Sequence, residues 1–466
     1  MPDGWGTGPA SIVTLDNVAE YHVENFGCRA SRADGESIAA SLRHRGLSEA
    51  ADPAAANVVI VNTCSVTAEA DRQALAWIRR VRRRNPGARV IVTGCYAQRA
   101  PQEIAALPGV DAVIGNSHKA LVAEAAAGFS AQPPARLAPP GFVPLAAILH
   151  DDFAHTELAT LPFAADAHQT RPNLKVQDGC GNRCSFCIIP ATRGHSRSVS
   201  LEVCLESVER FVIRGGKELV LSGINLARWG RDLHPASRFE DLVHAILTRT
   251  ALPRLRLSSI EPMDWSADLL ALYREFSAGE HPRLARHTHL PLQSGSDAIL
   301  RRMHRRYRPW HYAERLAQIR DLLPDAAIGA DVMIGFPGET DALFDESYRF
   351  IAEQPFTYLH LFPFSARPGT PAWELHRQNP VSASAVHERM TALRRLMSEK
   401  FRAFRMRFLG RTLSAVTLDG KFAEPATEAV TDNFLKLALE VPLAGNSLIA
   451  TRVTALSGDG VCGATF

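Results

Sequence analysis

Three cysteines in one short segment are the residues of this sequence best suited to chemistry. Cys180, Cys184 and Cys187 are spaced Cys-x3-Cys-x2-Cys, with Gly179 before the first and Phe186 before the third. A structural zinc site normally takes four protein ligands, usually from two paired knuckles, and no fourth cysteine or pairable histidine follows closely in the sequence. A cubane iron–sulfur cluster held by three thiolates leaves one iron open to a small molecule. The spacing therefore predicts such a cluster.

A second set of three cysteines is spread along the first hundred residues. Cys28, Cys64 and Cys95 each come one to three residues after the end of a segment that we predict to be a strand. The carboxyl ends of parallel strands meet at one edge of a sheet, where open α/β sheets bind ligands. We therefore expect the three thiols to converge on a second iron–sulfur cluster. The alternative is three buried free cysteines, since cysteine is often buried.

The elements that must position these thiols alternate between strands and helices. Residues 57–61 and 89–93 are short continuous apolar runs, typical of buried parallel strands. Residues 34–45 and 69–84 carry apolar side chains at helical spacing. This alternation predicts an α/β fold that begins with a Rossmann-like parallel βαβ domain over residues 20–130.

The rest of the chain divides into three further parts. Residues 131–170 are rich in alanine and proline and are predicted to be a linker with one short element near 143–149, just as residues 1–19 are predicted to be a loose extension. Residues 171–400 repeat strand and helix about six times, which predicts a partial (β/α)6 barrel with its site at the carboxyl ends of the strands. Residues 405–466 contain short strands and glycine turns, which predict a small all-β barrel.

Composition and charge narrow the class of protein. The chain has 466 residues, 46% of them hydrophobic, and a net charge of +3. No apolar run reaches the ~18–20 residues of a membrane span, and the first residues lack a signal-peptide pattern, so we expect a cytoplasmic protein without membrane contact. Arginines cluster at residues 79–84, 301–308 and 394–411. Each cluster could contact RNA phosphates, although a charged helix face is as often merely solvated.

Several short motifs together match one enzyme family. They include Phe26-Gly27-Cys28, Asn62-Thr63-Cys64, Gly94-Cys95-Tyr96-Ala97-Gln98, Cys180–Cys187, Arg193-Gly194-His195-Ser196-Arg197-Ser198 and Gly335-Phe336-Pro337-Gly338-Glu339. On these residues the sequence resembles the radical S-adenosylmethionine (SAM) methylthiotransferases over nearly all of residues 20–466. The branch that modifies N6-threonylcarbamoyladenosine in tRNA is the most similar. The branches that act on isopentenyladenosine in tRNA or on a ribosomal-protein aspartate are neighbours.

The resemblance implies a transferase with two [4Fe-4S] clusters and SAM. Cys180, Cys184 and Cys187 would hold the cluster that cleaves SAM to a 5′-deoxyadenosyl radical. Cys28, Cys64 and Cys95 would hold an auxiliary cluster that carries the sulfur. One SAM would donate the methyl group and another the radical. The implied partners are tRNA, an electron donor of the flavodoxin or ferredoxin type, and a sulfur source. The terminal barrel would correspond to the family's RNA-binding TRAM domain, although its glycine and charge pattern departs from that family.

The same resemblance assigns contacts to SAM. Glu218 is expected to meet the SAM amino group, the alternative being a surface carboxylate at the start of a strand. Ser259, Gln293, Asp331 and Gly335 lie at or near strand ends and are further candidates.

Other residues receive plainer interpretations. His289 and His360 are interpreted as packing or substrate-lining residues rather than metal ligands, and Cys204 and Cys462 as spare thiols. Ser31 stands where the family tends to have asparagine, so a hydrogen bond near the auxiliary cluster would differ. A non-enzymatic alternative is an RNA-binding protein stabilised by zinc.

Overall fold

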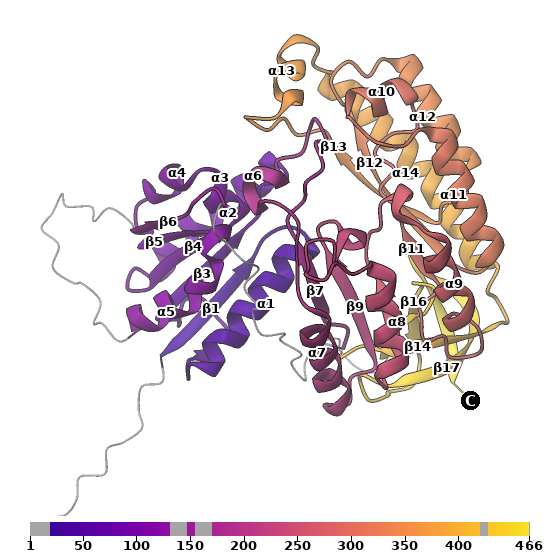
Figure 1. Cartoon of the computed structure of the whole chain (residues 1–466), viewed down its shortest axis with the longest axis horizontal. Helices are drawn as coiled ribbons and strands as arrows, with labels where there is room; N and C mark the ends of the chain where they lie inside the picture. The colour runs from indigo at the N-terminus through magenta and orange to yellow at the C-terminus, as the bar shows by residue number, and fades with distance from the viewer. Residues whose placement is uncertain (1–18, 131–146, 154–169, 420–426, 466) are drawn as a thin grey trace, which may run out of the picture.

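The computed structural model describes residues 19–130, 147–153, 170–419 and 427–465. Residues 1–18 of the expected extension and most of the expected linker lie outside the described residues. Figure 1 shows three parts: an N-terminal α/β domain in indigo and purple, a central strand–helix domain, and a small C-terminal barrel in yellow.

The N-terminal domain is built on a six-stranded parallel sheet with the order β2-β1-β3-β4-β5-β6. Its strands are β1 (Glu20–Asn25), β2 (Ser48–Glu49), β3 (Val58–Thr63), β4 (Arg89–Gly94), β5 (Ala112–Gly115) and β6 (Ala147–Leu149). Its helices are α1 (Arg29–His44), α2 (Ala68–Arg84), α3 (Cys95–Arg99), α4 (Pro101–Ala105), the 3-10 helix η1 (Asn116–Leu121) and α5 (Val122–Ser130). The predicted parallel domain is confirmed.

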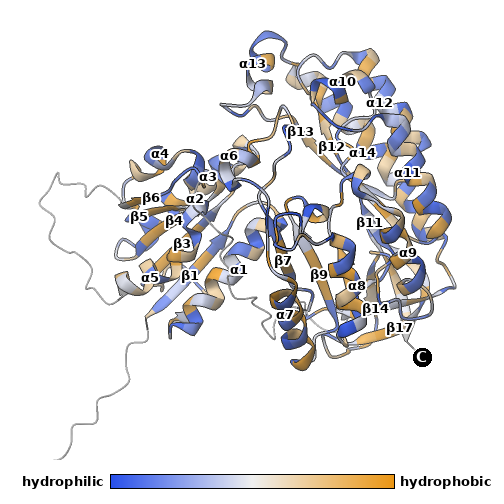
Figure 2. Cartoon of the chain, viewed as in Figure 1, coloured by the Kyte–Doolittle hydropathy of each residue, from blue (hydrophilic) through white to orange (hydrophobic). Residues whose placement is uncertain are grey.

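Helices cover both faces of this sheet. Val59 and Val61 of β3 pack into one core with Ile78 of α2, whereas Val58 and Ile60 enter the opposite core with Ile38 of α1. Successive side chains of a strand point to opposite faces, so a strand covered on both sides is a continuous apolar run. Figure 2 shows this concentration of apolar residues in strands such as β3.

Part of the predicted linker belongs to the sheet. Strand β6 pairs with β5 in parallel, with Ile148 opposite Val113. Ile148 packs against the same core as Val113, so burial of this apolar segment extends the N-terminal domain beyond residue 130.

The central domain has six parallel strands in two sheets, β10-β9-β7-β8 and β11-β12-β13. These strands are β7 (Asn173–Asp178), β9 (Glu218–Gly223), β10 (Arg254–Leu257), β11 (His287–His289), β12 (Ala327–Ile334) and β13 (Tyr358–Pro363), with β8 (Arg197–Ser198) antiparallel at one edge. The sheets meet where the Leu255 N–H donates to the Arg283 carbonyl at 2.7 Å and the Ala285 N–H donates to the Leu255 carbonyl at 2.9 Å. This is the predicted partial (β/α)6 barrel.

Helices surround these strands. They are α6 (Ile189–Arg193), α7 (Leu201–Ile213), η2 (Leu226–Arg228), α8 (Phe239–Arg249), η3 (Pro262–Asp264), α9 (Ala267–Phe276), α10 (Asp297–Arg302), α11 (Pro309–Leu322), α12 (Asp341–Glu353), α13 (Pro371–Gln378) and α14 (Ala383–Met406). Among the described residues, no helix combines the length and the apolar character that crossing a membrane requires.

The C-terminal strands form a closed barrel of the order β14-β15-β16-β18-β17. Its strands are β14 (Thr412–Thr417), β15 (Thr427–Thr431), β16 (Lys436–Leu439), β17 (Leu448–Ser457) and β18 (Gly460–Thr465). Its core includes Ala327, the first residue of β12. The barrel therefore lies at the amino ends of the central strands, opposite the end at which barrel enzymes carry their sites. The predicted terminal all-β barrel is confirmed.

Candidate active site

The thiols of Cys28, Cys64 and Cys95 come together at the carboxyl edge of the N-terminal sheet. Cys64 and Cys95 directly follow β3 and β4, and Cys28 lies between β1 and α1. Cys64 is 2% exposed and Cys95 1%, whereas Cys28 is exposed. Burial raises the pKa of Cys64 to about 12, with further contributions from the nearby Cys95 and Cys28 thiols. At neutral pH the Cys64 thiol therefore keeps its proton unless a ligand replaces it. Metal ions replace thiol protons in this way when they bind cysteine.

Gly27 makes the approach of these thiols possible. Its φ is +100°, and a Cβ at this position would lie 2.2 Å from the Cys64 Cβ and 2.4 Å from the Cys64 Sγ. Only glycine combines this backbone conformation with the absence of a side chain. Gly27 thus lets Cys64 lie against the turn that carries Cys28, and with Cys95 also near Cys64 the arrangement fits a cluster held by three cysteines.

The second thiol set lies in the loop between β7 and α6. The Cys180 sulfur accepts hydrogen bonds from the Asn182 N–H at 3.4 Å and from the Asn225 Nδ2 at 3.7 Å. The Arg305 Nη1 donates to the Cys184 sulfur at 3.3 Å. Burial raises the pKa of Cys187 to about 12. Donors aimed at the sulfurs favour thiolates, so this loop also fits an iron–sulfur cluster.

One cavity of about 560 Å³ lies between the N-terminal and central domains and is lined by cysteines of both sets. Cys28 lines it from one side, and Cys180, Cys184 and Cys187 line it from the other. The cavity has the size typical of small-molecule sites. A nucleoside bound in it would therefore be in reach of both cysteine loops.

Three of the five predicted SAM contacts line this cavity: Ser259, Gln293 and Asp331. Gln293 has a φ of +64°, and its buried Oε1 has no hydrogen-bond partner among the described residues. The same holds for Asn225 Oδ1 and Ser258 Oγ, which also belong to cavity-lining residues. Buried polar atoms are normally satisfied, so these three indicate a polar ligand.

Glu218 does not line the cavity, which corrects its predicted role. It is the first residue of β9 and thus lies at the amino end of the strand, away from the site. Its buried carboxylate pairs with Arg171 at 2.6 Å, with Arg256 at 2.7 Å and with Arg254 at 3.4 Å. These arginines hold the pKa of Glu218 well below its usual range, against the effect of burial. The Arg256 Nη1 also donates to the Asp432 carbonyl at 3.0 Å, so Glu218 helps to join the two barrels.

Gly335, the fifth predicted contact, lies just after β12 and is also outside the cavity lining. Its φ is +77°, and its N–H donates to the Glu339 carboxylate at 2.8 Å. A Cβ there would lie 2.5 Å from the Val386 Cγ2. Gly335 therefore shapes a turn that packs against α14.

His289 and His360 line the cavity together with Asp331. The His289 Nδ1 lies 2.8 Å from the Ser259 Oγ, and the His360 Nδ1 lies 3.2 Å from the Asp331 Oδ1. Burial lowers the pKa of His289 to about 4, so its ring is neutral near pH 7. The interpretation of both histidines as lining residues agrees with this position.

The predicted arginine clusters differ in their surroundings. Arg301, Arg302 and Arg306 are exposed, but Arg305 is buried, and it also pairs with Glu261, a second cavity residue. From the sequence alone, Arg305 could not be distinguished from its exposed neighbours in the 301–308 cluster. In the third cluster, Arg405 donates to the Gly458 and Gly460 carbonyls at 2.6 and 2.9 Å, so part of that cluster serves the terminal barrel.

Comparison with known proteins agrees with this geometry. Two family models match: "Uncharacterized protein family UPF0004" over residues 20–115 and "Radical SAM superfamily" over residues 174–351. A radical S-adenosylmethionine methyltransferase, TsrM from Kitasatospora setae, shares the fold, with a TM-score of 0.55 and 15% identity over 78% of this chain and 76% of that one. The fold and the site thus define a radical SAM enzyme.

Sequence relatives narrow the class further. The chain is 33% identical to the threonylcarbamoyladenosine tRNA methylthiotransferase MtaB of Bacillus subtilis (strain 168), over 91% of each chain. It is 32% identical to the tRNA-2-methylthio-N(6)-dimethylallyladenosine synthase of Acidothermus cellulolyticus, over 89% of this chain and 80% of that one. The chain belongs to the radical SAM methylthiotransferase family. It is therefore a transferase, which replaces the zinc-stabilised alternative, and the two predicted clusters and SAM are the cofactors of this family.

Proposed function

We propose that this enzyme inserts a methylthio group at C2 of N6-threonylcarbamoyladenosine in tRNA, at position 37 beside the anticodon. The observation that carries the proposal is the cavity that Cys28 shares with Cys180, Cys184 and Cys187. Four relatives named threonylcarbamoyladenosine tRNA methylthiotransferase, 32–33% identical to this chain, support the choice of substrate.

The ligand assignment follows the thiol sets. Cys180, Cys184 and Cys187 would hold the cluster that, with SAM, supplies a 5′-deoxyadenosyl radical, and Cys28, Cys64 and Cys95 would hold the auxiliary cluster. A radical route suits the inert C2–H bond of adenine, and the cofactor supplies that chemistry. One SAM serves as methyl donor and another as radical source. An electron donor of the flavodoxin or ferredoxin type and a sulfur source are further requirements.

The chain's own residues would bind SAM and orient the cluster-bearing loop. Ser259, Gln293 and Asp331 are our candidates for SAM contacts, joined by Asn225 and Ser258, whose unpartnered oxygens belong to the cavity lining. Arg305 donates to the Cys184 sulfur at 3.3 Å and so would orient the loop that carries the radical-generating cluster.

Arg29 favours a substrate that carries a carboxylate. It follows Cys28 directly, lines the cavity and forms no ion pair within the described part of the chain. The threonyl group of N6-threonylcarbamoyladenosine ends in a carboxylate, whereas the isopentenyl group is apolar. Arginine recognises carboxylates by paired hydrogen bonds, so Arg29 would hold this group beside Cys28.

Nucleoside mass spectrometry tests the proposal. Reconstituted enzyme is incubated anaerobically with tRNA, SAM, sulfide and a reductant, and the digested nucleosides are analysed. We expect a methylthio increment on N6-threonylcarbamoyladenosine that disappears in a variant with Cys28, Cys64 and Cys95 replaced by alanine. An increment on isopentenyladenosine would favour the neighbouring tRNA branch. Formation of 5′-deoxyadenosine without any modified nucleoside would favour the ribosomal-protein aspartate.

A further inference from the structure

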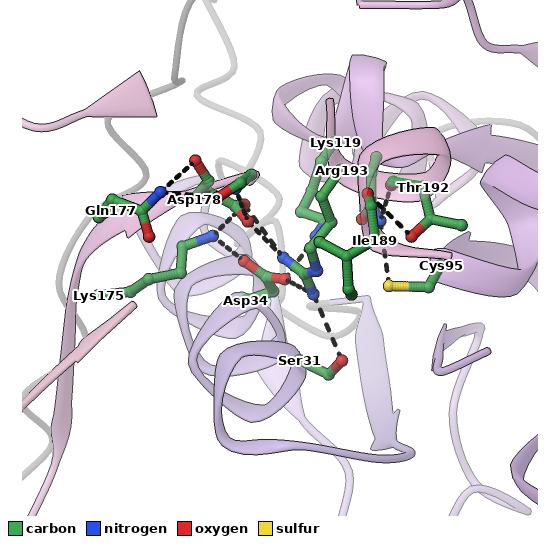
Figure 3. Close-up of polar contacts among 12 residues, drawn as sticks. Ser31, Asp34, Cys95, Lys119, Lys175, Gln177, Asp178, Ile189, Thr192 and Arg193 are labelled. Atoms are coloured by element: carbon green, nitrogen blue, oxygen red, sulfur yellow. Dashed lines mark hydrogen bonds and ion pairs between the residues drawn. The ribbon is translucent and has the colours of Figure 1, made fainter. Parts of the chain in front are cut away.

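A buried cluster of charged side chains lies where the N-terminal and central domains meet (Figure 3). We call it the interface charge cluster, and it consists of Asp34 of α1, Lys119 of η1, Lys175 and Asp178 of β7, and Arg193 of α6. Arg193 is 0% exposed and Asp34 0%. The five residues come from both domains, although residues 34 and 193 are 159 positions apart in the sequence.

Arg193 is the centre of this cluster. Its Nη1 donates to both oxygens of Asp178, at 2.9 and 3.0 Å, and its Nη2 donates to the Asp34 Oδ2 at 2.9 Å. Lys175 contacts both carboxylates, reaching Asp178 at 2.8 Å, and Lys119 lies 2.5 Å from Asp34. The two carboxylates are thus each bound by more than one cation.

The charges of the cluster do not cancel. Three cations face two carboxylates, which leaves one positive charge in excess. Each carboxylate lies within 3.0 Å of at least two cationic nitrogens, and this contact favours the ionised form of both. A buried charge without a counter-charge is costly, so a neighbouring anion would stabilise this arrangement.

The excess charge lies next to the N-terminal cysteines. The Arg193 Nη2 is 3.4 Å from the Ser31 Oγ, which in turn is 3.7 Å from the Cys28 sulfur. On the other side, Asn116 Nδ2 donates both to the Thr192 carbonyl, at 2.8 Å, and to the Cys95 sulfur, at 3.4 Å. The segment that carries Arg193 therefore contacts the surroundings of two of the three thiols.

A cubane core of charge two plus held by three thiolates carries one net negative charge, and two after it gains an electron. The interface charge cluster thus offers the opposite charge at the required place. We propose that it is a redox-tuning site of the auxiliary cluster, with Arg193 as its positioning residue. This inference rests on the assignment of Cys28, Cys64 and Cys95 as cluster ligands, and not on the identity of the substrate.

The step that is tuned is a one-electron reduction. A low-potential one-electron donor of the ferredoxin or flavodoxin class would supply one electron to the cluster held by Cys28, Cys64 and Cys95, and no covalent bond would form or break. The excess positive charge stabilises the reduced form more than the oxidised form, because the reduced form carries more negative charge. The potential of the auxiliary cluster is therefore higher than it would be without the interface charge cluster.

The experiment uses the full-length chain with Cys180, Cys184 and Cys187 replaced by alanine, so that only the auxiliary cluster is loaded. Its midpoint potential is measured by anaerobic titration with dithionite, followed by electron paramagnetic resonance. Arg193→Gln should lower the ratio of reduced to oxidised cluster at a fixed potential about tenfold, a shift of the midpoint potential of about 59 mV to more negative values for one electron. Asp34→Asn should shift the potential in the opposite direction.

Two further variants separate charge from structure. Arg193→Lys keeps the charge and should retain most of the parent potential. Arg389→Gln is a matched control, because Arg389 is also a buried arginine with two carboxylate partners, Glu339 and Asp341, but belongs to α14; it should leave the potential unchanged. The proposal would be overturned in favour of a purely structural role by any of three results. These are a shift of the midpoint potential in the same direction in Arg193→Gln and Asp34→Asn, no shift in either variant, or the failure of both variants and of Arg193→Lys to hold any cluster.

Discussion

Replacing Gly27 with alanine should abolish the auxiliary cluster and leave the other cluster intact. The added Cβ would lie 2.2 Å from the Cys64 Cβ and 2.4 Å from its sulfur. Non-bonded carbon atoms are comfortable at about 3.5–4.0 Å, so Cys64 must move by about 1 Å or more. Metal sites tolerate ligand displacements of only about 0.2 Å.

The cost in stability has two parts. An L-residue at positive φ costs about 1–2 kcal/mol, and overpacking typically costs about 1–3 kcal/mol. Gly27→Ala should therefore lower the free energy of unfolding of the cluster-free protein by about 2–5 kcal/mol. Gly46 is a matched control, since its φ is +84° and a Cβ there would meet nothing within 4 Å. Gly46→Ala should lower the free energy of unfolding only by the about 1–2 kcal/mol that comes from the positive φ.

Iron and sulfide analysis after anaerobic reconstitution gives the decisive comparison. Two cubane clusters supply about eight irons per chain, so we expect about eight for Gly46→Ala and about four for Gly27→Ala, with the spectrum of the remaining cluster and its cleavage of SAM preserved. If Gly27→Ala binds as much iron as Gly46→Ala, the three thiols do not converge as described, and the reasoning from Gly27 fails.

Two other predictions concern Glu218 and Arg29. Glu218→Gln should lower the free energy of unfolding by about 3–5 kcal/mol, because it leaves buried arginines without their counter-charge. SAM cleavage per folded molecule should be unchanged. A loss of SAM binding without a loss of stability would instead place Glu218 in the site. Since the folded-state pKa of Glu218 is lowered, its contribution to the free energy of unfolding is complete above its unfolded pKa of about 4.3 and is lost as the pH falls below that value. Chemical denaturation between about pH 5 and pH 3 should therefore show a smaller decline in the free energy of unfolding for Glu218→Gln than for the parent. Arg29→Gln should reduce kcat/KM on N6-threonylcarbamoyladenosine tRNA by about 10- to 100-fold, as expected for a lost charge-assisted hydrogen bond of about 1.5–3 kcal/mol. Arg29→Lys should retain most activity, and 5′-deoxyadenosine formation without tRNA should be the same in both variants and the parent enzyme. Equal kcat/KM in Arg29→Gln and the parent enzyme would exclude a contact with the substrate.

The cysteine sets could be predicted from the sequence because their positions depend on local rules. Cys180, Cys184 and Cys187 belong to one loop, and their spacing alone indicates a shared ligand. Cys28, Cys64 and Cys95 follow strands whose apolar runs are visible in the sequence, and parallel strands end at one edge. Topology therefore brings these three thiols to the same place without any knowledge of side-chain packing.

The partners of Glu218 and the contacts of the interface charge cluster could not be found in this way. Glu218 begins its strand, and the partner that explains its burial, Arg256, also binds residue 432 of the terminal barrel. The direction of the strand would have separated Glu218 from the site, because a residue at the amino end faces away from it. Asp34 and Arg193 meet only when two domains dock, and no periodicity in either segment encodes that contact.

The cavity between the domains also bears on how such an enzyme can be divided or recombined. One wall carries Cys28 and Arg29, and the other carries Cys180, Cys184 and Cys187. Each half of the chain contains a complete thiol set, but neither half alone encloses a nucleoside. If the roles proposed for Arg29 and for the two cysteine sets hold, a chimera that joins halves from two relatives would inherit its substrate preference partly from residue 29 and its radical chemistry from the other parent. Its activity would then depend on whether Asp34 of one parent still meets Arg193 of the other.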